Sequence, residues 1–179
     1  MGPLTRIATV ALNGADFDTF DRKLAHGLEL VDHAAASNPD IVCLPETFAT
    51  FHLSGSPRRW AQPLDGDLVT AVADRAHRHE CAVVCPMLLG EDDRVYNASV
   101  LIDRTGAIAG VYRKVHLVAS KPDYSLLESG LTPGLEYPVF ASDVGPVGVQ
   151  ICFDLEFEDG WNALGRGGAR IVFWPSAYD

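Results

Sequence analysis

The sequence has few basic residues: 14 Lys and Arg stand against 24 Asp and Glu, and the formal net charge is -10. Nucleic acids and anionic membranes bind clustered basic side chains, so this balance indicates neither as a partner. No apolar run approaches the roughly 20 residues that a membrane-spanning helix needs. Residues 1–6 also lack the long apolar stretch of a secretory signal peptide. Together with the four cysteines described next, the lack of an export signal predicts a cytoplasmic protein.

Cysteine is also scarce, with four residues at 43, 81, 85 and 152. In a chain of this size without an export signal they favour reduced thiols over disulfides. The first three lie in apolar segments, where a free cysteine behaves as a small buried hydrophobe. The His-rich segment 77–80 beside them matches no established zinc spacing, so we expect neither a metal nor another cofactor. A metal or redox protein remains a less favoured alternative.

The length of 179 residues fits one domain over residues 1–179. Hydrophobic periodicity predicts helices at 16–36, 66–79 and 157–165, and strands at 7–12, 40–45, 81–89, 95–102, 107–117, 137–141, 144–152 and 171–174. Residues 48–63 and 118–136 read as loops. Helices alternate with strands at both ends of the chain and a hairpin lies between, which predicts an α/β fold with mixed strand directions.

The strongest chemical signal is Cys152, which ends the apolar run 147–151 just before a polar, acidic stretch. This pattern indicates a strand that delivers a thiol into a turn, where backbone N–H groups favour a thiolate and a developing oxyanion. Glu46 directly follows the predicted strand 40–45, and Lys114 lies near the end of the predicted strand 107–117. A thiolate could attack an acyl carbon, a carboxylate could move protons, and an ammonium with the Phe153 backbone N–H could counter the oxyanion. These residues predict a C–N hydrolase that needs no metal.

Six short segments support this prediction by their order along the chain. They are Leu44-Pro45-Glu46, Tyr96-Asn97-Ala98, the stretch 112–117, Glu128 with Thr132-Pro133-Gly134, the stretch 150–154, and Pro175-Ser176-Ala177. In this order they resemble the signatures of the nitrilase superfamily, the carbon-nitrogen hydrolases. The resemblance implies an α-β-β-α sandwich, a homo-oligomer, and a catalytic triad carried over onto Glu46, Lys114 and Cys152. It also implies that Glu128 is a second carboxylate in the pocket.

The residues after the nucleophile bear on the substrate. Cys152-Phe153-Asp154 is similar to the amidase and carbamoylase branches of the superfamily, whereas nitrile hydrolysers tend to carry Trp-Glu after the cysteine. We therefore expect a small-molecule amide or N-carbamoyl substrate and a thioester intermediate. The alternative is a catalytically silent scaffold or binding module. For Asn97 and His116 we expect structural hydrogen bonds.

The chain departs from the superfamily pattern at two places. Glu158 stands where similar proteins usually carry proline, a residue suited to the first turn of a helix. The sequence also stops at Asp179, whereas members of the superfamily continue with strands and helices that would cover strand 171–174. We expect the last part of the sandwich to be missing here, and an uncovered apolar strand invites association. An incomplete gene product, completion by another chain, and a shortened inactive protein remain open explanations.

Overall fold

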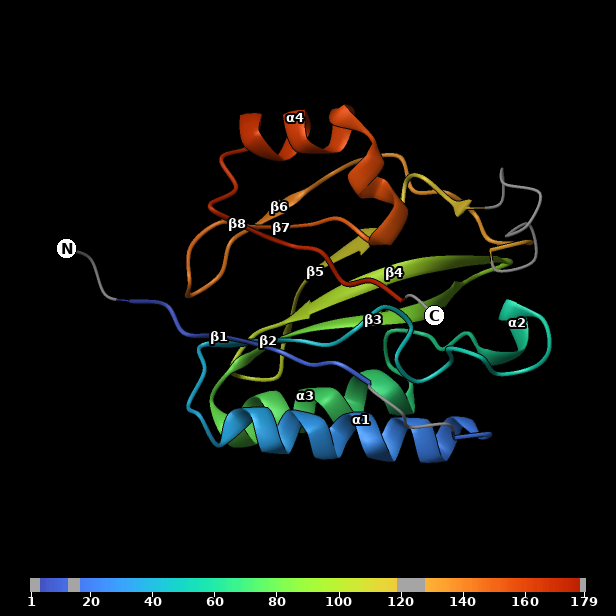
Figure 1. Ribbon diagram of the computed structural model, residues 1–179, viewed down its shortest axis with the longest axis horizontal. Helices are drawn as coiled ribbons and strands as arrows, with labels where there is room; N and C mark the ends of the chain where they lie inside the picture. Colours follow the sequence, from blue (N-terminus) through green and yellow to red (C-terminus); the bar gives the residue numbers. More distant parts are fainter. Residues whose placement is uncertain (1–3, 13–16, 119–127, 178–179) are drawn as a thin grey trace.

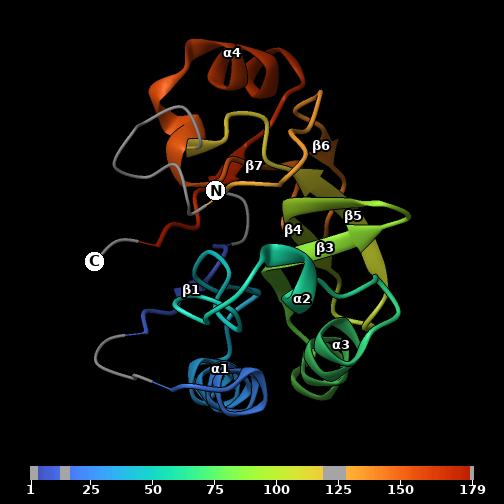
Figure 2. The same ribbon diagram turned by 90° about the vertical axis from the view of Figure 1, so that its right-hand side faces the viewer.

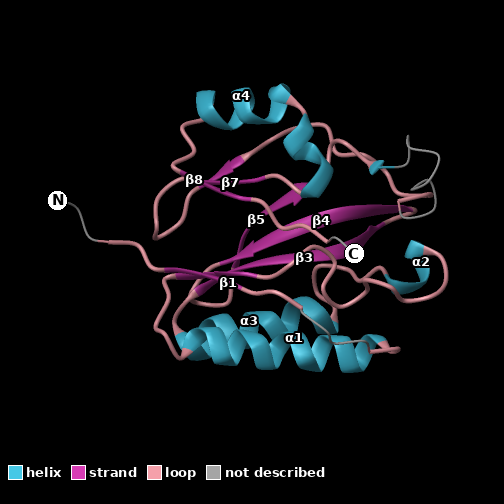
Figure 3. Cartoon of the chain, in the orientation of Figure 1, coloured by secondary structure: helices cyan, strands magenta, loops and turns pink. Residues whose placement is uncertain are grey.

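The computed structural model describes residues 4–12, 17–118 and 128–177, which form four layers (Figure 1). Helices α1 and α3 make one outer layer, two sheets lie between, and α4 makes the other outer layer (Figure 3). The helices are α1 (Phe20–Ala35), α2 (Pro57–Trp60), α3 (Asp67–His79) and α4 (Glu158–Arg166), with the 3-10 helix η2 at Cys152–Glu156. The strands are β1 (Ile7–Thr9), β2 (Ile41–Cys43), β3 (Ala82–Glu91), β4 (Arg94–Ile102), β5 (Ile108–Arg113), β6 (Val139–Phe140), β7 (Val147–Val149) and β8 (Ile171–Phe173). The predicted α-β-β-α arrangement is confirmed.

The larger sheet has the order β1-β2-β3-β4-β5. The first three strands are parallel, whereas the pairs β3–β4 and β4–β5 are antiparallel. Its outer face packs against α1 and α3 around buried residues such as Val31, Val42 and Val72. The prediction of mixed strand directions is therefore correct. It missed only that β3 and β4 also pair as an antiparallel hairpin.

The smaller sheet has the order β6-β7-β8, antiparallel at the first junction and parallel at the second. Figure 2 shows it between α4 and the larger sheet. Its inner face meets the larger sheet in a second core that includes Val84, Tyr112, Val149 and Phe173. These strands are shorter than the sequence predicts. The regular pairing of β7 ends at Val149, and the residues after it make only separate backbone hydrogen bonds to β8 and the segment that follows β8.

Two local features fix how the helices sit on the sheet. Thr19 caps α1 by accepting a hydrogen bond from the backbone N–H of Arg22 at 3.4 Å. Gly27 in the same helix lies so close to Phe48 that an added Cβ would be 2.3 Å from the ring. The absence of a side chain at position 27 therefore lets α1 approach the segment that follows β2.

The regions that departed from expectation are also explained by local structure. The predicted loop 48–63 contains the short helix α2, which begins at Pro57, a residue suited to a first helical turn. Helix α4 begins at Glu158, the position where similar proteins usually carry proline. The side chain of Phe157, just before it, makes no capping bond, so α4 forms with neither feature. Its first turn carries two acidic residues, whose negative charges stabilise the helix because they lie at the positive end of its dipole.

Strands β1 and β8 are the end strands of their sheets and line one common groove. Trp174, just after β8, is 39% exposed. Within the described part of the chain, no helix is both long and apolar enough to cross a bilayer.

Candidate active site

Glu46 lies just beyond the end of β2, where the chain leaves the larger sheet. Its carboxylate is buried and accepts three hydrogen bonds. Oε1 accepts from Lys114 Nζ at 3.0 Å and from Asn97 Nδ2 at 2.8 Å, while Oε2 accepts from the backbone N–H of Ala177 at 2.9 Å. The carboxylate is therefore held by a residue within β4, by the residue after β5 and by the segment after β8.

Lys114 follows β5 directly and is only 1% exposed. Its ammonium donates to Oε1 of Glu46 and to Oε1 of Glu128, the latter at 2.9 Å. Burial alone would lower the pKa of Lys114, but the charges of the two carboxylates outweigh it and raise that pKa above its ordinary value. The side chain is thus a fixed positive charge, and its three N–H donors leave one for a further partner.

Glu128 enters the site from the segment before β6 and is buried like Glu46. Its Oε2 accepts from the backbone N–H of Val118, and its Oε1 accepts from Lys114 and from Asn97 Nδ2. Backbone bonds tie the following residues to the larger sheet, since Gly134 N–H donates to the carbonyl of Lys114 at 2.8 Å. The two glutamates therefore have matching sets of donors around one lysine.

Asn97, on β4, completes this arrangement and is 2% exposed. Its Nδ2 donates to Oε1 of Glu46 at 2.8 Å and to Oε1 of Glu128 at 2.7 Å, the same two oxygens that face Lys114. The expected structural hydrogen bonds are therefore present, but they lie inside the site. The sequence signal was an amide in an otherwise apolar strand, because a buried amide needs partners.

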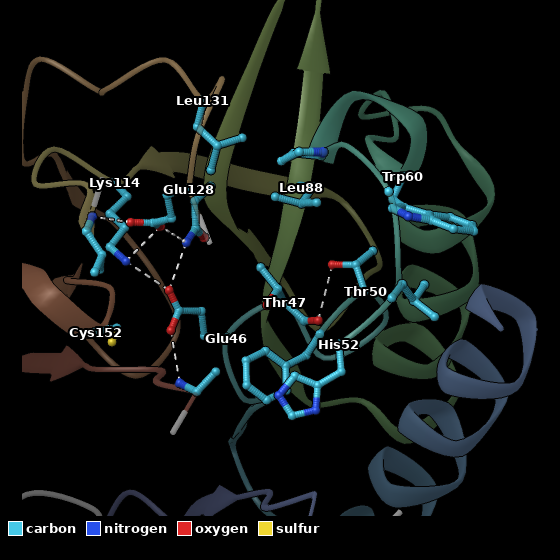
Figure 4. A pocket seen from close by; sticks show the side chains of 17 residues that line it. Glu46, Thr47, Thr50, His52, Trp60, Leu88, Lys114, Glu128, Leu131 and Cys152 are labelled. Atoms are coloured by element: carbon cyan, nitrogen blue, oxygen red, sulfur yellow. Dashed lines mark hydrogen bonds and ion pairs between the residues drawn. The ribbon is translucent and has the colours of Figure 1, made fainter. Parts of the chain in front are cut away.

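Cys152 begins η2 with φ +43°, a left-handed conformation that costs strain in a residue with a Cβ. Its backbone N–H donates to the carbonyl of Pro175 at 3.0 Å, and its carbonyl accepts from the indole N–H of Trp174 at 2.8 Å. This turn places the thiol at the same pocket as Glu46 and Lys114. Figure 4 shows all three on one side of that pocket.

Asp154 fastens the Cys152 turn to the end of β5. Its fully buried carboxylate accepts from Tyr112 Oη at 2.6 Å, from the backbone N–H of Ile151 at 2.9 Å and from that of His116 at 2.8 Å. Burial raises the pKa of Asp154 above its ordinary value, although these three donors oppose the rise. The contact couples the Cys152 turn to the end of β5, next to Lys114.

Phe153, whose backbone N–H we expected to serve the oxyanion, is the second residue of η2. Its ring packs edge-on against Phe157 at 5.3 Å between centroids.

The other three cysteines lie away from this site and are free and buried. Burial raises the pKa of the Cys43 thiol to about 12, as expected for a packing residue. Within residues 4–12, 17–118 and 128–177, no group of three or more His, Cys, Asp or Glu side chains could hold a metal ion.

The pocket itself has a cavity volume of about 220 Å³. Glu46, Lys114, Glu128 and Cys152 all line it, together with Asn97 and residues of the segment between β2 and α2. The four side chains predicted as one site from distant parts of the sequence are therefore brought together. Their catalytic roles remain a proposal.

The sequence profile of the family described as carbon-nitrogen hydrolase matches residues 6–178. The chain belongs to this family. It is 34% identical over 182 residues to the Drosophila melanogaster nitrilase and fragile histidine triad fusion protein NitFhit, which covers 96% of this chain and 38% of that protein. It is 32% identical to the human deaminated glutathione amidase, over 84% of this chain and 49% of that protein.

The fold of this carbon-nitrogen hydrolase family member is also that of solved relatives. The crystal structure of Saccharomyces cerevisiae Nit3, a member of branch 10 of the nitrilase superfamily, superposes with a TM-score of 0.82 at 24% identity. That match covers 98% of this chain and 65% of the Nit3 chain. The chain thus spans 38 to 49% of the two curated relatives named above and about two thirds of this solved structure.

Proposed function

We propose that this protein hydrolyses the C–N bond of a small amide or N-carbamoyl compound through a thioester on Cys152. The observation that carries the proposal is the meeting of the thiol, the Glu46 carboxylate and the Lys114 ammonium at one pocket. Similarity to the human deaminated glutathione amidase supports an amide as the substrate class. The proposal needs no group beyond these side chains and water.

In the first half of the reaction, Glu46 takes the thiol proton of Cys152 as the sulfur attacks the carbonyl carbon. The carbonyl oxygen becomes an oxyanion beside the remaining ammonium N–H of Lys114 and the backbone N–H of Phe153. The C–N bond then breaks, and the departing amine receives the proton held by Glu46. The products of this half are an amine, or ammonia, and a thioester.

In the second half, Glu46 takes a proton from a water molecule as the water oxygen attacks the thioester carbon. The C–S bond breaks, the acid leaves, and the proton returns from Glu46 to the sulfur of Cys152. Glu128 and Asn97 hold Lys114 and Glu46 in place, because their hydrogen bonds meet on the same atoms. The ammonium stays charged throughout, in keeping with the raised pKa of Lys114.

The test is ammonia release from a panel of primary amides, N-carbamoyl amines and nitriles, with Cys152→Ala as the control. We expect release from amides or carbamoyl compounds by the wild-type protein, at least about a thousandfold above the variant. Intact mass spectrometry during turnover should show the acyl group on Cys152. A folded protein that releases no ammonia from any member of the panel, and forms no acyl adduct, would support the scaffold alternative.

A further inference from the structure

The described lining of the pocket carries an excess of negative charge. It contains the carboxylates of Glu46 and Glu128, the ammonium of Lys114 and the imidazole of His52. Among the residues that the structure describes, this lining holds no arginine and no second lysine. Two carboxylates against one ammonium leave these three described groups about one unit negative, so a substrate with its own carboxylate meets like charge there.

The donors that face the pocket are also committed. Two of the three N–H groups of Lys114 bind the glutamates, and the proposed reaction needs the third at the carbonyl oxygen. Both N–H groups of the Asn97 amide bind the same glutamates. None of these donors is left to bind a substrate carboxylate at the other end of the acyl chain.

Two arginines that are neighbours of lining residues in the sequence serve other contacts. Arg58 and Arg59 lie in α2 between two residues that line the pocket, Pro57 and Trp60. The guanidinium of Arg58 donates to the carbonyl of Asp93, and that of Arg59 lies 4.7 Å from the centre of the Trp60 ring. Neither arginine is among the described residues that line the pocket.

Part of the wall opposite the charged groups is apolar, and Thr47, Thr50 and His52 lie beside this part. Figure 4 shows Leu88 and Trp60 across the pocket from Lys114 and Cys152, with Leu131 at its edge. Apolar side chains gain free energy by covering apolar substrate surface and lose it by desolvating a charge. A cavity of about 220 Å³ lies below the roughly 300–1,000 Å³ typical of pockets for drug-sized ligands, so the substrate is small.

We infer that the site selects small amides with an uncharged, apolar acyl chain and discriminates against amides that carry a carboxylate. The inference rests on the proposed function for the reacting bond. The charge selection itself is a property of the pocket that can be measured without turnover.

Turnover of valeramide and glutaramate is the first test, because the two amides have the same carbon chain and differ only in a terminal methyl or carboxylate. We expect kcat/KM for valeramide to exceed that for glutaramate by at least about tenfold, since like charges brought together lower affinity by this order or more. Equal values, or a preference for glutaramate, would overturn the inference while leaving the hydrolase proposal intact.

Alkylation of Cys152 is the second test and needs no catalysis. Iodoacetamide and iodoacetate react alike: a C–S bond forms, iodide leaves and the thiol proton passes to solvent. Peptide mapping gives the rate at Cys152 for each reagent, and the ratio is divided by that of a small uncharged thiol. We expect a normalised preference for iodoacetamide of at least about tenfold. A ratio near one would overturn the inference whatever the turnover assay shows.

Leu131 offers a matched pair of variants, because it lines the pocket and its side chain takes no part in the proposed chemistry. Leu131→Arg adds a cation at the pocket edge and should lower the normalised alkylation ratio at least about fivefold, whereas uncharged Leu131→Gln should change it by less than about twofold. Equal effects of the two variants would contradict a charge-based selection. If alkylation stays selective while neither amide is hydrolysed, the hydrolase proposal fails and the inferred charge selection stands.

Discussion

Asn97→Asp is the most informative single change, because it replaces the amide nitrogen that bridges two carboxylates with a third carboxylate oxygen. The replaced atom lies 2.8 Å from Glu46 Oε1 and 2.7 Å from Glu128 Oε1. At an effective dielectric constant near 20, one such pair of like charges costs about 6 kcal/mol. The folded protein should avoid this cost by binding one extra proton at the site.

The free-energy cost of binding that proton sets how much stability the Asn97→Asp variant loses. With an unfolded pKa of about 3.9, keeping one aspartate protonated costs about 4 kcal/mol at pH 7 and about 1.5 kcal/mol at pH 5. The folded-state pKa is raised, so this group's contribution to stability is full below about pH 3.9 and is lost as the pH rises. The deficit of the variant relative to wild type should therefore grow by about 1.4 kcal/mol per pH unit between pH 5 and 7.

Urea unfolding followed by tryptophan fluorescence at pH 5, 6 and 7 measures this deficit. Asn97→Ala is the control: it removes both hydrogen bonds but adds no titrating group, so its deficit of about 3 kcal/mol should stay constant over this range. The slope expected for Asn97→Asp does not depend on which carboxyl group holds the proton. A deficit for Asn97→Asp that is parallel to that of Asn97→Ala would refute the bridging geometry.

Three further predictions concern the supports of the site and the core. Asp154→Asn turns an amide N–H toward a donor, so the free energy of unfolding should fall by at least about 2 kcal/mol. For Tyr112→Phe the expected fall is about 1 kcal/mol, and urea unfolding measures both. Equal losses would contradict the three-donor arrangement. Gly27→Ala should lower stability by about 1–3 kcal/mol in thermal unfolding, because the new methyl group meets Phe48, whereas a gain would show that the contact relaxes freely. The raised pKa of Cys43 means that its neutral thiol stabilises the fold below the unfolded pKa of about 8.5, and that this contribution is lost toward pH 12. Under reducing conditions, Cys43→Ala should therefore lose about 1.4 kcal/mol less stability than wild type between pH 7 and 9.5, and identical losses would argue against burial of this thiol.

Much of the fold could be predicted because the main helices are amphipathic. Apolar residues such as Leu28 and Val31 recur along α1 at helical spacing, and both are buried against the sheet. The site could be predicted in part because its charged residues follow strands. Glu46 follows β2, whose three residues are buried, and Lys114 comes directly after β5, which brings both to the same edge of the larger sheet.

The remaining features depend on contacts that no local pattern encodes. The backbone N–H groups of Ala177 and Val118 hold the two glutamates, and any residue type could supply them. The dual role of the Asn97 amide depends on where both carboxylates lie. The ends of β6 and β7 were predicted too long because apolar residues continue past the last ladder pair.

The position of β8 has a consequence for how often the site is assembled. This three-residue strand ends the smaller sheet, and the residues just after it anchor both the Cys152 backbone and the Glu46 carboxylate. Each local opening of β8 away from β7 would therefore release the Cys152 turn and the Glu46 carboxylate at once. The fraction of molecules with the proposed site assembled then follows an opening equilibrium at one sheet edge, and hydrogen exchange at Phe173 would report that equilibrium.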